Sequence, residues 1–195
     1  MQGFVRSTLL SVFALLALVT VVCHAAETTT TAIKDATILQ TGQTICTECT
    51  NSRCDMCPRG QEAKLTMNLG LKTYIRALVG FHLPVPASQV TSCTVDFPDF
   101  ITPLRSETEL EIATAASSTW DEGTVTGANA PESGSAIAQV KVAPGGRITG
   151  VDVTAACRAA DANGLFSIYV RGSWEFVELP SKEAGKPATL HVVSS

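Results

Sequence analysis

The chain is poor in the side chains that nucleic-acid binding requires. Its 195 residues include 14 lysines and arginines against 18 aspartates and glutamates, which gives a formal net charge of −4 at pH 7. Nucleic-acid-binding domains carry a surplus of basic residues, so this balance argues against a nucleic-acid partner. It still allows an anionic polysaccharide, because a local basic cluster can attract anions in a chain of negative average charge.

The common catalytic motifs are also missing. The chain contains no nucleophile-elbow serine, no His-Glu-x-x-His zinc motif and no phosphate-binding glycine loop. Beyond the N-terminal segment its histidines are His82 and His191, each within a strand pattern, where an imidazole commonly has a structural role. Paired acids occur at Asp121-Glu122 and at Glu109 and Glu111. Glycosidases use two carboxylates, but acids in these loop and strand positions are typical of a solvated surface. We therefore expect no catalytic residues and no enzymatic activity.

Long apolar runs are absent except at the N-terminus. Arg6 precedes an apolar stretch from Leu9 to Val22, and Cys23 and Ala25 place small residues at −3 and −1 of a cleavage site. The stretch is shorter than the ~20 residues that span a bilayer. We predict that residues 1–26 are a secretory signal peptide, cleaved after Ala25 or Ala26. The mature protein is then expected to be extracellular and not bound to a membrane.

Six of the seven cysteines lie beyond the signal peptide, at Cys46, Cys49, Cys54, Cys57, Cys93 and Cys157. An even number in a secreted chain indicates a disulfide framework. The first four form two C-x-x-C pairs, which would also suit a four-thiolate zinc site. We expect disulfides instead, because zinc ribbons separate their pairs more widely and exported thiols oxidise. Three pairings are open within these four, and any of them leaves Cys93 to bond Cys157.

The positions of the acidic residues predict no metal site, and no cofactor is expected. Loop carboxylates such as those of Asp121 and Asp152 could hold a structural calcium ion. Neither residue lies in the pattern of a known calcium-binding loop, however, so the sequence gives no positive argument for such an ion.

Short strands make up the rest of the pattern. In the clearest of them, from Tyr74 to Leu83, apolar residues recur at every second position around an apolar centre, which predicts a strand with its odd-numbered residues against a core. Pro84 and Pro86 then end it, because proline has no N–H for a ladder. Further strands are predicted over residues 35–39, 64–69, 90–97, 109–113, 136–142, 148–153, 165–170, 175–179 (as a hairpin partner of the preceding strand) and 188–193.

Nine or so strands separated by Gly/Pro turns indicate an all-β fold. We predict a two-sheet antiparallel β-sandwich, jelly-roll-like, with one short helix over 154–160 and a disulfide-stapled loop over 42–60. The polar residues 117–134 predict a long ordered loop or a broken pair of short strands. In domain terms, residues 27–34 are expected to form a flexible N-terminal lead, and residues 35–195 a single domain.

Two tryptophans and a few cations are candidates for a binding surface. Trp174 is flanked by turns, and its ring could either stack on a sugar or fold back into the core. Burial in the core is more typical of Trp120, which lies in the long loop. Tyr74 and Arg76 share the predicted outward face of their strand. If Arg171 lies nearby, these residues would form a concave basic surface for uronate or sulfate groups. The alternative is a set of scattered, solvated cations.

Five short segments occur in the order typical of one family. They are RALVGFHL at 76–83, WDEGTVT at 120–126, NAP at 129–131, VDVT at 151–154 and SKEA at 181–184. Together they resemble the DNRLRE domains, which are also classed as carbohydrate-binding module family 96. The resemblance spans residues 35–193 and implies a secreted, non-catalytic β-sandwich that adheres to polysaccharide. The chain departs from the family at Gly127, where a second tryptophan is common, and in its cysteine cluster.

We therefore predict a secreted carbohydrate-binding domain that adheres to an extracellular or cell-wall polysaccharide, with an anionic glycan as one candidate. The predicted ligand-binding residues are Tyr74, Arg76, Arg171 and Trp174. One alternative is a disulfide-stabilised structural or protein-interaction domain, which two buried tryptophans would favour. A third is a small polysaccharide hydrolase or lyase, which would need His82 or Tyr74 in a pocket against paired acids.

Overall fold

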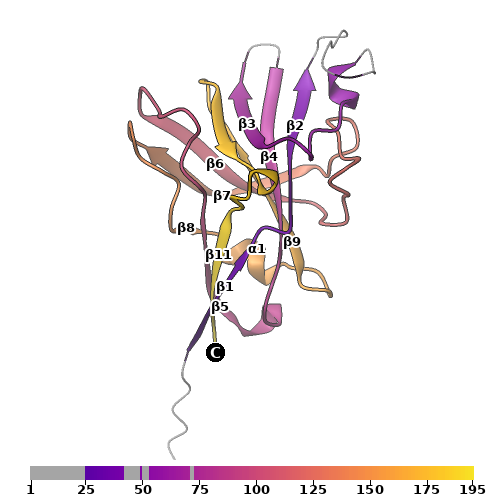
Figure 1. Cartoon of the computed structure of the whole chain (residues 1–195). Coiled ribbons are helices and arrows are strands. Elements are labelled where there is room, and N and C mark those ends of the chain that lie inside the picture. Colours follow the sequence, from indigo (N-terminus) through magenta and orange to yellow (C-terminus); the bar gives the residue numbers. More distant parts are fainter. Residues whose placement is uncertain (1–24, 42–48, 50–52, 71–72) are drawn as a thin grey trace, which may run out of the picture.

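The computed structural model describes residues 25–41, 49, 53–70 and 73–195 (Figure 1). Within these residues the chain has one α-helix, α1 (Thr154–Arg158), and three short 3-10 turns, η1 (Cys54–Met56), η2 (Ala87–Gln89) and η3 (Lys182–Ala184). The strands are β1 (Ala26–Thr31), β2 (Lys34–Thr41), β3 (Lys64–Leu69), β4 (Thr73–His82), β5 (Val90–Asp96), β6 (Thr108–Ala115), β7 (Ser133–Val142), β8 (Val151–Asp152), β9 (Leu165–Arg171), β10 (Val177–Pro180) and β11 (Thr189–Ser194). In this part of the chain, no helix is long and apolar enough to cross a membrane. Residues 1–24 of the predicted signal peptide lie outside the described ranges.

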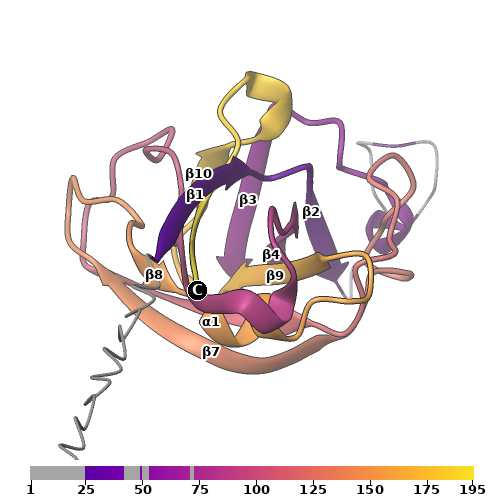
Figure 2. The same cartoon turned by 90° about the horizontal axis from the view of Figure 1, so that it is seen from below.

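The strands form two antiparallel sheets, as predicted. One has four strands in the order β1-β11-β5-β8, and the other has seven, in the order β10-β3-β4-β9-β6-β7 with β2 paired to β4. Figure 2 shows the sandwich from below, with α1 next to β9. The all-β class, the two sheets, the single α-helix and the disulfides are therefore confirmed.

Strand β4 is the centre of the larger sheet. It pairs with β2 through residues 73–80 and with β9 through residues 77–82. The side chains of Ala77, Val79 and Phe81 point into the main core between the sheets, as the period of two predicts. Phe81 stacks on its cross-strand partner Phe166, with ring centroids 5.3 Å apart. This pairing buries two large rings where the sheets face each other.

The other face of β4 is also buried, under the loop 116–132. Leu78 of β4 and Tyr169 of β9 pack there against Trp120 and Val125 of the loop. The indole N–H of Trp120 donates a hydrogen bond to Ser167 Oγ at 3.0 Å, which satisfies the one polar group of this buried ring. Trp120 is therefore the core plug that its loop position predicted.

The covering loop is fastened to its surroundings at several points. Lys34 Nζ lies 4.3 Å from the centre of the Trp120 ring and donates to the carbonyl of Trp120 at 2.7 Å. Gly127 lies so close to the carbonyl of Leu39 that a Cβ would clash with it, so the family's second tryptophan cannot fit here without a shift of the backbone. The backbone N–H of Ala128 donates to the carbonyl of Asp55 in η1 at 2.9 Å. The loop and η1 accordingly lie together beside β2 in both cartoon views (Figures 1 and 2).

The structure corrects three local predictions. Residues 27–34 do not form a lead without structure, because Ala26–Thr31 is strand β1, paired residue by residue with β11. The β-branched threonines that made this segment look polar also favour a strand. Strand β10 pairs with β3 and is not a hairpin partner of β9. The strand predicted over 148–153 is reduced to Val151–Asp152.

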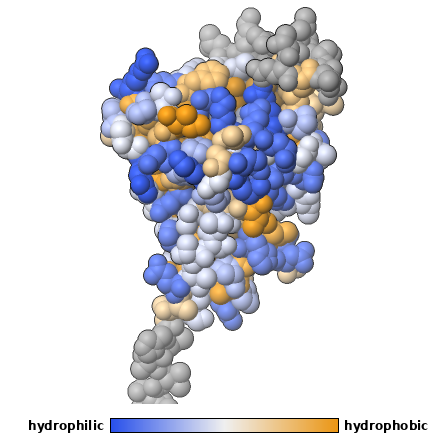
Figure 3. Space-filling view, viewed as in Figure 1, coloured by the Kyte–Doolittle hydropathy of each residue, from blue (hydrophilic) through white to orange (hydrophobic). Residues whose placement is uncertain are grey.

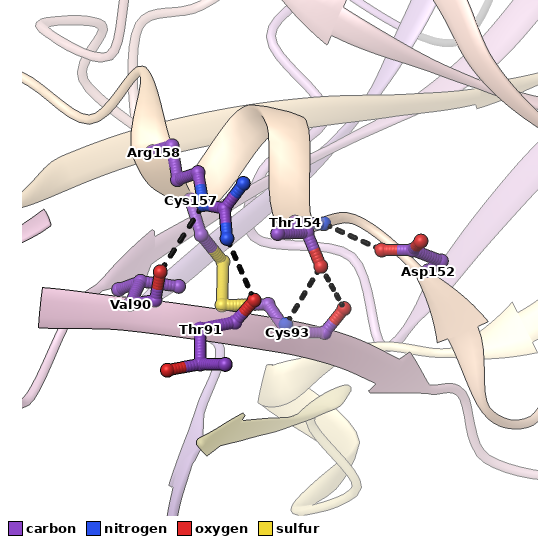
Figure 4. Close-up of a disulfide and its surroundings, with 7 residues drawn as sticks. All are labelled: Val90, Thr91, Cys93, Asp152, Thr154, Cys157 and Arg158. Carbon is purple, nitrogen blue, oxygen red and sulfur yellow. Dashed lines mark hydrogen bonds between the residues drawn. A yellow bond between two sulfur atoms is a disulfide. The ribbon is translucent and has the colours of Figure 1, made fainter. Parts of the chain in front are cut away.

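Two disulfides are formed among the described cysteines. Cys49 bonds Cys57, which removes two of the thiolates that the zinc alternative needed, and Cys93 bonds Cys157, as predicted. Cys54 is buried, and Cys46 lies outside the described residues. Figure 4 shows how the Cys93–Cys157 bond joins β5 to α1. Thr154 Oγ1 accepts from the backbone N–H of Cys93 at 2.9 Å beside the disulfide.

The Cys93–Cys157 bond spans 64 residues and should contribute more to stability than the local Cys49–Cys57 bond, which spans eight. On the chain-entropy model, replacing Cys93 and Cys157 together by serine should lower the free energy of unfolding by about 4 kcal/mol, against about 2–3 kcal/mol for the Cys49/Cys57 double variant. Urea unfolding of both variants measures the difference. An equal or inverted order would contradict the argument from loop length.

The two tryptophans should differ sharply in their effect on stability. Trp120 is 9% exposed and Trp174 is 69% exposed. We expect Trp120→Ala to lower the free energy of unfolding by about 3–5 kcal/mol, and Trp174→Ala to change it by no more than about 0.5 kcal/mol. Both values come from urea titration followed by circular dichroism. Similar losses in the two variants would show that Trp174 also supports the fold.

Candidate carbohydrate-binding groove

A groove with a volume of about 490 Å³ lies at one end of the larger sheet. Its walls come from the end of β3, the segment leading into β6 and β6 itself, one residue of β7, and the segment that follows β9. The lining residues are Leu69, Ser106, Glu107, Thr108, Glu109, Leu110, Glu111, Gln139, Gly172, Ser173, Trp174 and Glu175. Apart from Leu69, Leu110, Gly172 and the indole of Trp174, these side chains are polar, so the groove can form many hydrogen bonds.

Trp174 combines a fixed backbone with an exposed ring. Its carbonyl accepts a hydrogen bond from Asn68 Nδ2 at 3.0 Å, and the neighbouring Ser173 carbonyl accepts from the backbone N–H of Leu69. Ser173 Oγ donates to the carbonyl of Glu175 at 2.9 Å. The indole nevertheless remains 69% exposed, and Phe176 two residues later is 68% exposed. The segment therefore presents aromatic rings to solvent from a backbone that is tied to β3.

Exposed apolar side chains of this size are few in the described part of the chain. They are Ile33, Met56, Ile101, Trp174 and Phe176. Figure 3 agrees with this picture on the face it shows, which is mostly hydrophilic and carries small, separate apolar patches. Two of the five residues belong to the segment that borders the groove. An exposed aromatic pair on a hydrophilic protein is typical of a binding surface.

Carboxylates dominate the charge of the groove among the described residues. Glu107, Glu109, Glu111 and Glu175 line it, and no lysine or arginine does. Lys141 is the cross-strand partner of Glu109, so it lies on the adjacent strand β7. Lys72, which the sequence places near Tyr74, lies outside the described residues. The described walls therefore do not form the basic surface that the sequence suggested.

Arg171 and Tyr74 lie in a smaller hollow of about 310 Å³ that shares Leu69, Glu111 and Gly172 with the groove. Arg171 Nε donates to Glu111 Oε1 at 2.7 Å, and its terminal nitrogens donate to Glu111 and to Ser133 Oγ. The guanidinium is thus neutralised by a neighbouring carboxylate. It could bind an anionic ligand only by giving up part of this pairing.

Arg76 is not part of either hollow. The prediction that it faces outward is wrong, because the side chain is 5% exposed. Its guanidinium carbon lies 4.2 Å from the ring centre of Tyr169 and 5.2 Å from that of Tyr74. Its Nε is buried without a hydrogen-bond partner in the described structure. The alternation correctly placed Arg76 opposite the main core, but the sheet is covered on that side as well.

The comparison with known families agrees with this architecture. The sequence profile of carbohydrate-binding module family 96 matches residues 59–194. The chain belongs to this family. It is also 42% identical to an uncharacterised secreted protein of Arthroderma benhamiae, over 160 residues that cover 82% of each chain. The resemblance seen in five short segments is thereby confirmed, and so is the prediction that the chain is secreted.

Within this family 96 domain, three of the four predicted binding residues come together. Tyr74, Arg171 and Trp174 border two hollows that share a wall, while Arg76 lies behind Tyr74. Sequence reasoning missed the acids Glu107 and Glu175. Their positions in the sequence could have indicated them, because Glu175 directly follows Trp174 and Glu107 precedes the strand that carries Glu109.

The residues considered for catalysis do not meet in one place. His82 is exposed at the end of β4, and His191 lies 3.3 Å from Asp96 Oδ2 on the smaller sheet. Tyr74 does share a hollow with one acid, but that acid, Glu111, is held by Arg171. The loop acids Asp121 and Asp152 accept local hydrogen bonds, from Thr124 Oγ1 and from the Thr154 N–H. None of these contacts places a base beside a pair of acids.

Arg76 provides a test of whether a buried cation supports the fold by its charge or by its volume. Because Arg76 makes ring contacts and no ion pair among the described residues, Arg76→Met should keep the free energy of unfolding within about 1.5 kcal/mol of wild type. Arg76→Ala leaves a cavity and should cost about 2–4 kcal/mol. Urea unfolding measures both. An equally large loss in Arg76→Met would show that the guanidinium itself is required.

Proposed function

We propose that the chain is a non-catalytic carbohydrate-binding domain that holds a polysaccharide in the groove beside Trp174. Membership of a carbohydrate-binding module family supports the class of ligand. The observation that carries the location is the exposed Trp174 ring at the edge of a groove lined by carboxylates, hydroxyls and an amide. No other hollow that we describe combines these features.

The ring and the polar walls suit different parts of a sugar. The C–H groups on one face of a pyranose are apolar and can pack on the flat indole, which is rigid and costs little conformational entropy to fix. The hydroxyls around the sugar can donate to Glu109 and Glu175 and exchange hydrogen bonds with Ser106 and Gln139. Hydrogen bonds to ionised acceptors are stronger than neutral ones, so carboxylates suit hydroxyl donors well.

The charge of the groove favours a neutral polysaccharide over an anionic one. A uronate or sulfate placed beside Trp174 would face the carboxylates of Glu107, Glu109 and Glu175. Like charges repel across the few ångströms of such a contact. Arg171, the one cation that borders the smaller hollow among the described residues, is already paired with Glu111.

The deciding experiment is a binding screen of the oxidised domain against neutral glucans, mannan and chitin and against alginate and polygalacturonate. Wild type should bind a neutral polysaccharide, with little change between low and high salt because no ion pair with the ligand is involved. Trp174→Ala should weaken this binding at least about tenfold, which corresponds to about 1.4 kcal/mol, whereas Trp174→Phe should keep part of it.

Ile33→Ala is the matched control, since Ile33 is an exposed apolar residue outside the groove. It should bind like wild type. Binding only to anionic glycans, with strong salt dependence, would contradict the neutral ligand. A folded domain that binds no polysaccharide would contradict carbohydrate binding and favour a protein-interaction domain. Release of reducing ends or unsaturated products from a bound polysaccharide would contradict the non-catalytic role.

A further inference from the structure

Three carboxylates meet at a second place in the fold, and none of them lines the groove. Asp35 of β2, Glu122 of the covering loop and Glu183 of η3 each contribute an oxygen that lies within 4.8 Å of the other two. Asp35 is 1% exposed, while the side chains of Glu122 and Glu183 are 17% and 18% exposed. The cluster is therefore buried on one side and open to water on the other.

Backbone donors fix the orientation of two of these carboxylates. The N–H of Asp35 donates to Glu122 Oε1 at 2.6 Å, and the N–H of Lys182 donates to Asp35 Oδ2 at 2.8 Å. Asp35 Oδ1 and Glu183 Oε2 are buried and have no partner in the described structure. Buried polar atoms are almost always paired, because an unpaired one loses its hydration without compensation. The described chain supplies no partner for these two oxygens, so their partner is expected to be a bound group.

Lys182 only partly offsets the negative charge. Its Nζ lies 3.2 Å from Glu122 Oε2 and 2.5 Å from Glu183 Oε1, so it contacts oxygens other than the two unpaired ones. Lys34 is a second cation whose charge interacts with that of Glu122, so two ammonium groups face three carboxylates. The cluster thus retains a surplus of negative potential around the buried carboxyl.

We propose that Asp35, Glu122 and Glu183 bind a calcium ion, with Asp35 Oδ1 and Glu183 Oε2 among its ligands. Calcium binds oxygen at about 2.3–2.6 Å, so two ligands on opposite sides of it are about 4.8 Å apart. Three oxygens within that span can all reach one ion. Water can complete the coordination on the open side of the cluster.

The ligand set favours calcium over other common ions. Carboxylates are hard ligands, which suit calcium, magnesium and manganese better than zinc or copper. Magnesium demands a near-ideal octahedron and gives up its water reluctantly, whereas calcium accepts irregular arrangements of several carboxylates. A bound calcium ion would connect β2, the covering loop and η3, three segments that are distant in the sequence. It would thereby hold the loop that carries Trp120 against the sheet.

The test is calcium binding to the whole secreted domain after it has been stripped with EDTA. Titration calorimetry should show one site. At a calcium concentration of 100 times Kd, the unfolding midpoint should rise by about 5–10 °C. Asp35→Asn and Glu183→Gln should each lose most of this rise, and Lys182→Met should bind calcium more tightly, because the competing ammonium is gone.

Glu132→Gln is the control, because Glu132 is an exposed acid at the end of the same loop and is not part of the cluster. This variant should respond to calcium like wild type. Magnesium at the same concentration should give a much smaller rise. The proposal is overturned if the stripped protein shows neither calcium heat nor a shift in midpoint. It is also overturned if Asp35→Asn and Glu183→Gln both keep the wild-type response. In that case calcium binds elsewhere on the domain.

Discussion

The burial of both faces of β4 is the constraint on which the rest of the structure depends. Ala77, Val79 and Phe81 complete the core between the sheets, and Leu78 on the other face needs a cover of its own. The loop 116–132 provides this cover through Trp120 and Val125. A strand that is buried on both sides is an apolar run and not a clean alternation, which explains the unbroken Ala77-Leu78-Val79 at its centre.

The two tryptophans show how one residue type serves opposite purposes. The indole N–H of Trp120 donates a hydrogen bond to Ser167 and its ring is packed, so Trp120 stabilises the contact between the loop and the sheet. Trp174 has its backbone held by Asn68 while its ring is left in water. An ordered backbone under a free ring means that little freedom is lost when the ring meets a ligand. The difference lies in what surrounds each ring, and composition alone cannot reveal it.

Local patterns predicted most of the strands, and what they missed depends on contacts between distant segments. Alternation placed β3, β4, β5, β9 and β11 nearly at their observed bounds. It could not reveal that β10 pairs with β3, because pairing is a choice among partners far along the chain. Alternation also gave the correct face for Arg76, but not the two tyrosine rings that lie against it. The sequence could not predict the cluster of Asp35, Glu122 and Glu183 for the same reason, since its members come from three separate segments.

The pairing of β1 with β11 has a practical consequence for the geometry of the whole domain. Ala26 and Ser194 are opposite each other in the ladder, so the first and last strands run side by side at one end of the molecule (Figure 1). Strand β3, whose last residue lines the groove, ends on the opposite side from the C-terminus in the same view. Neighbouring chain ends allow a domain to be inserted into a loop of another protein. This sandwich could therefore be mounted on a carrier or a surface through both ends, with its groove directed away from the attachment.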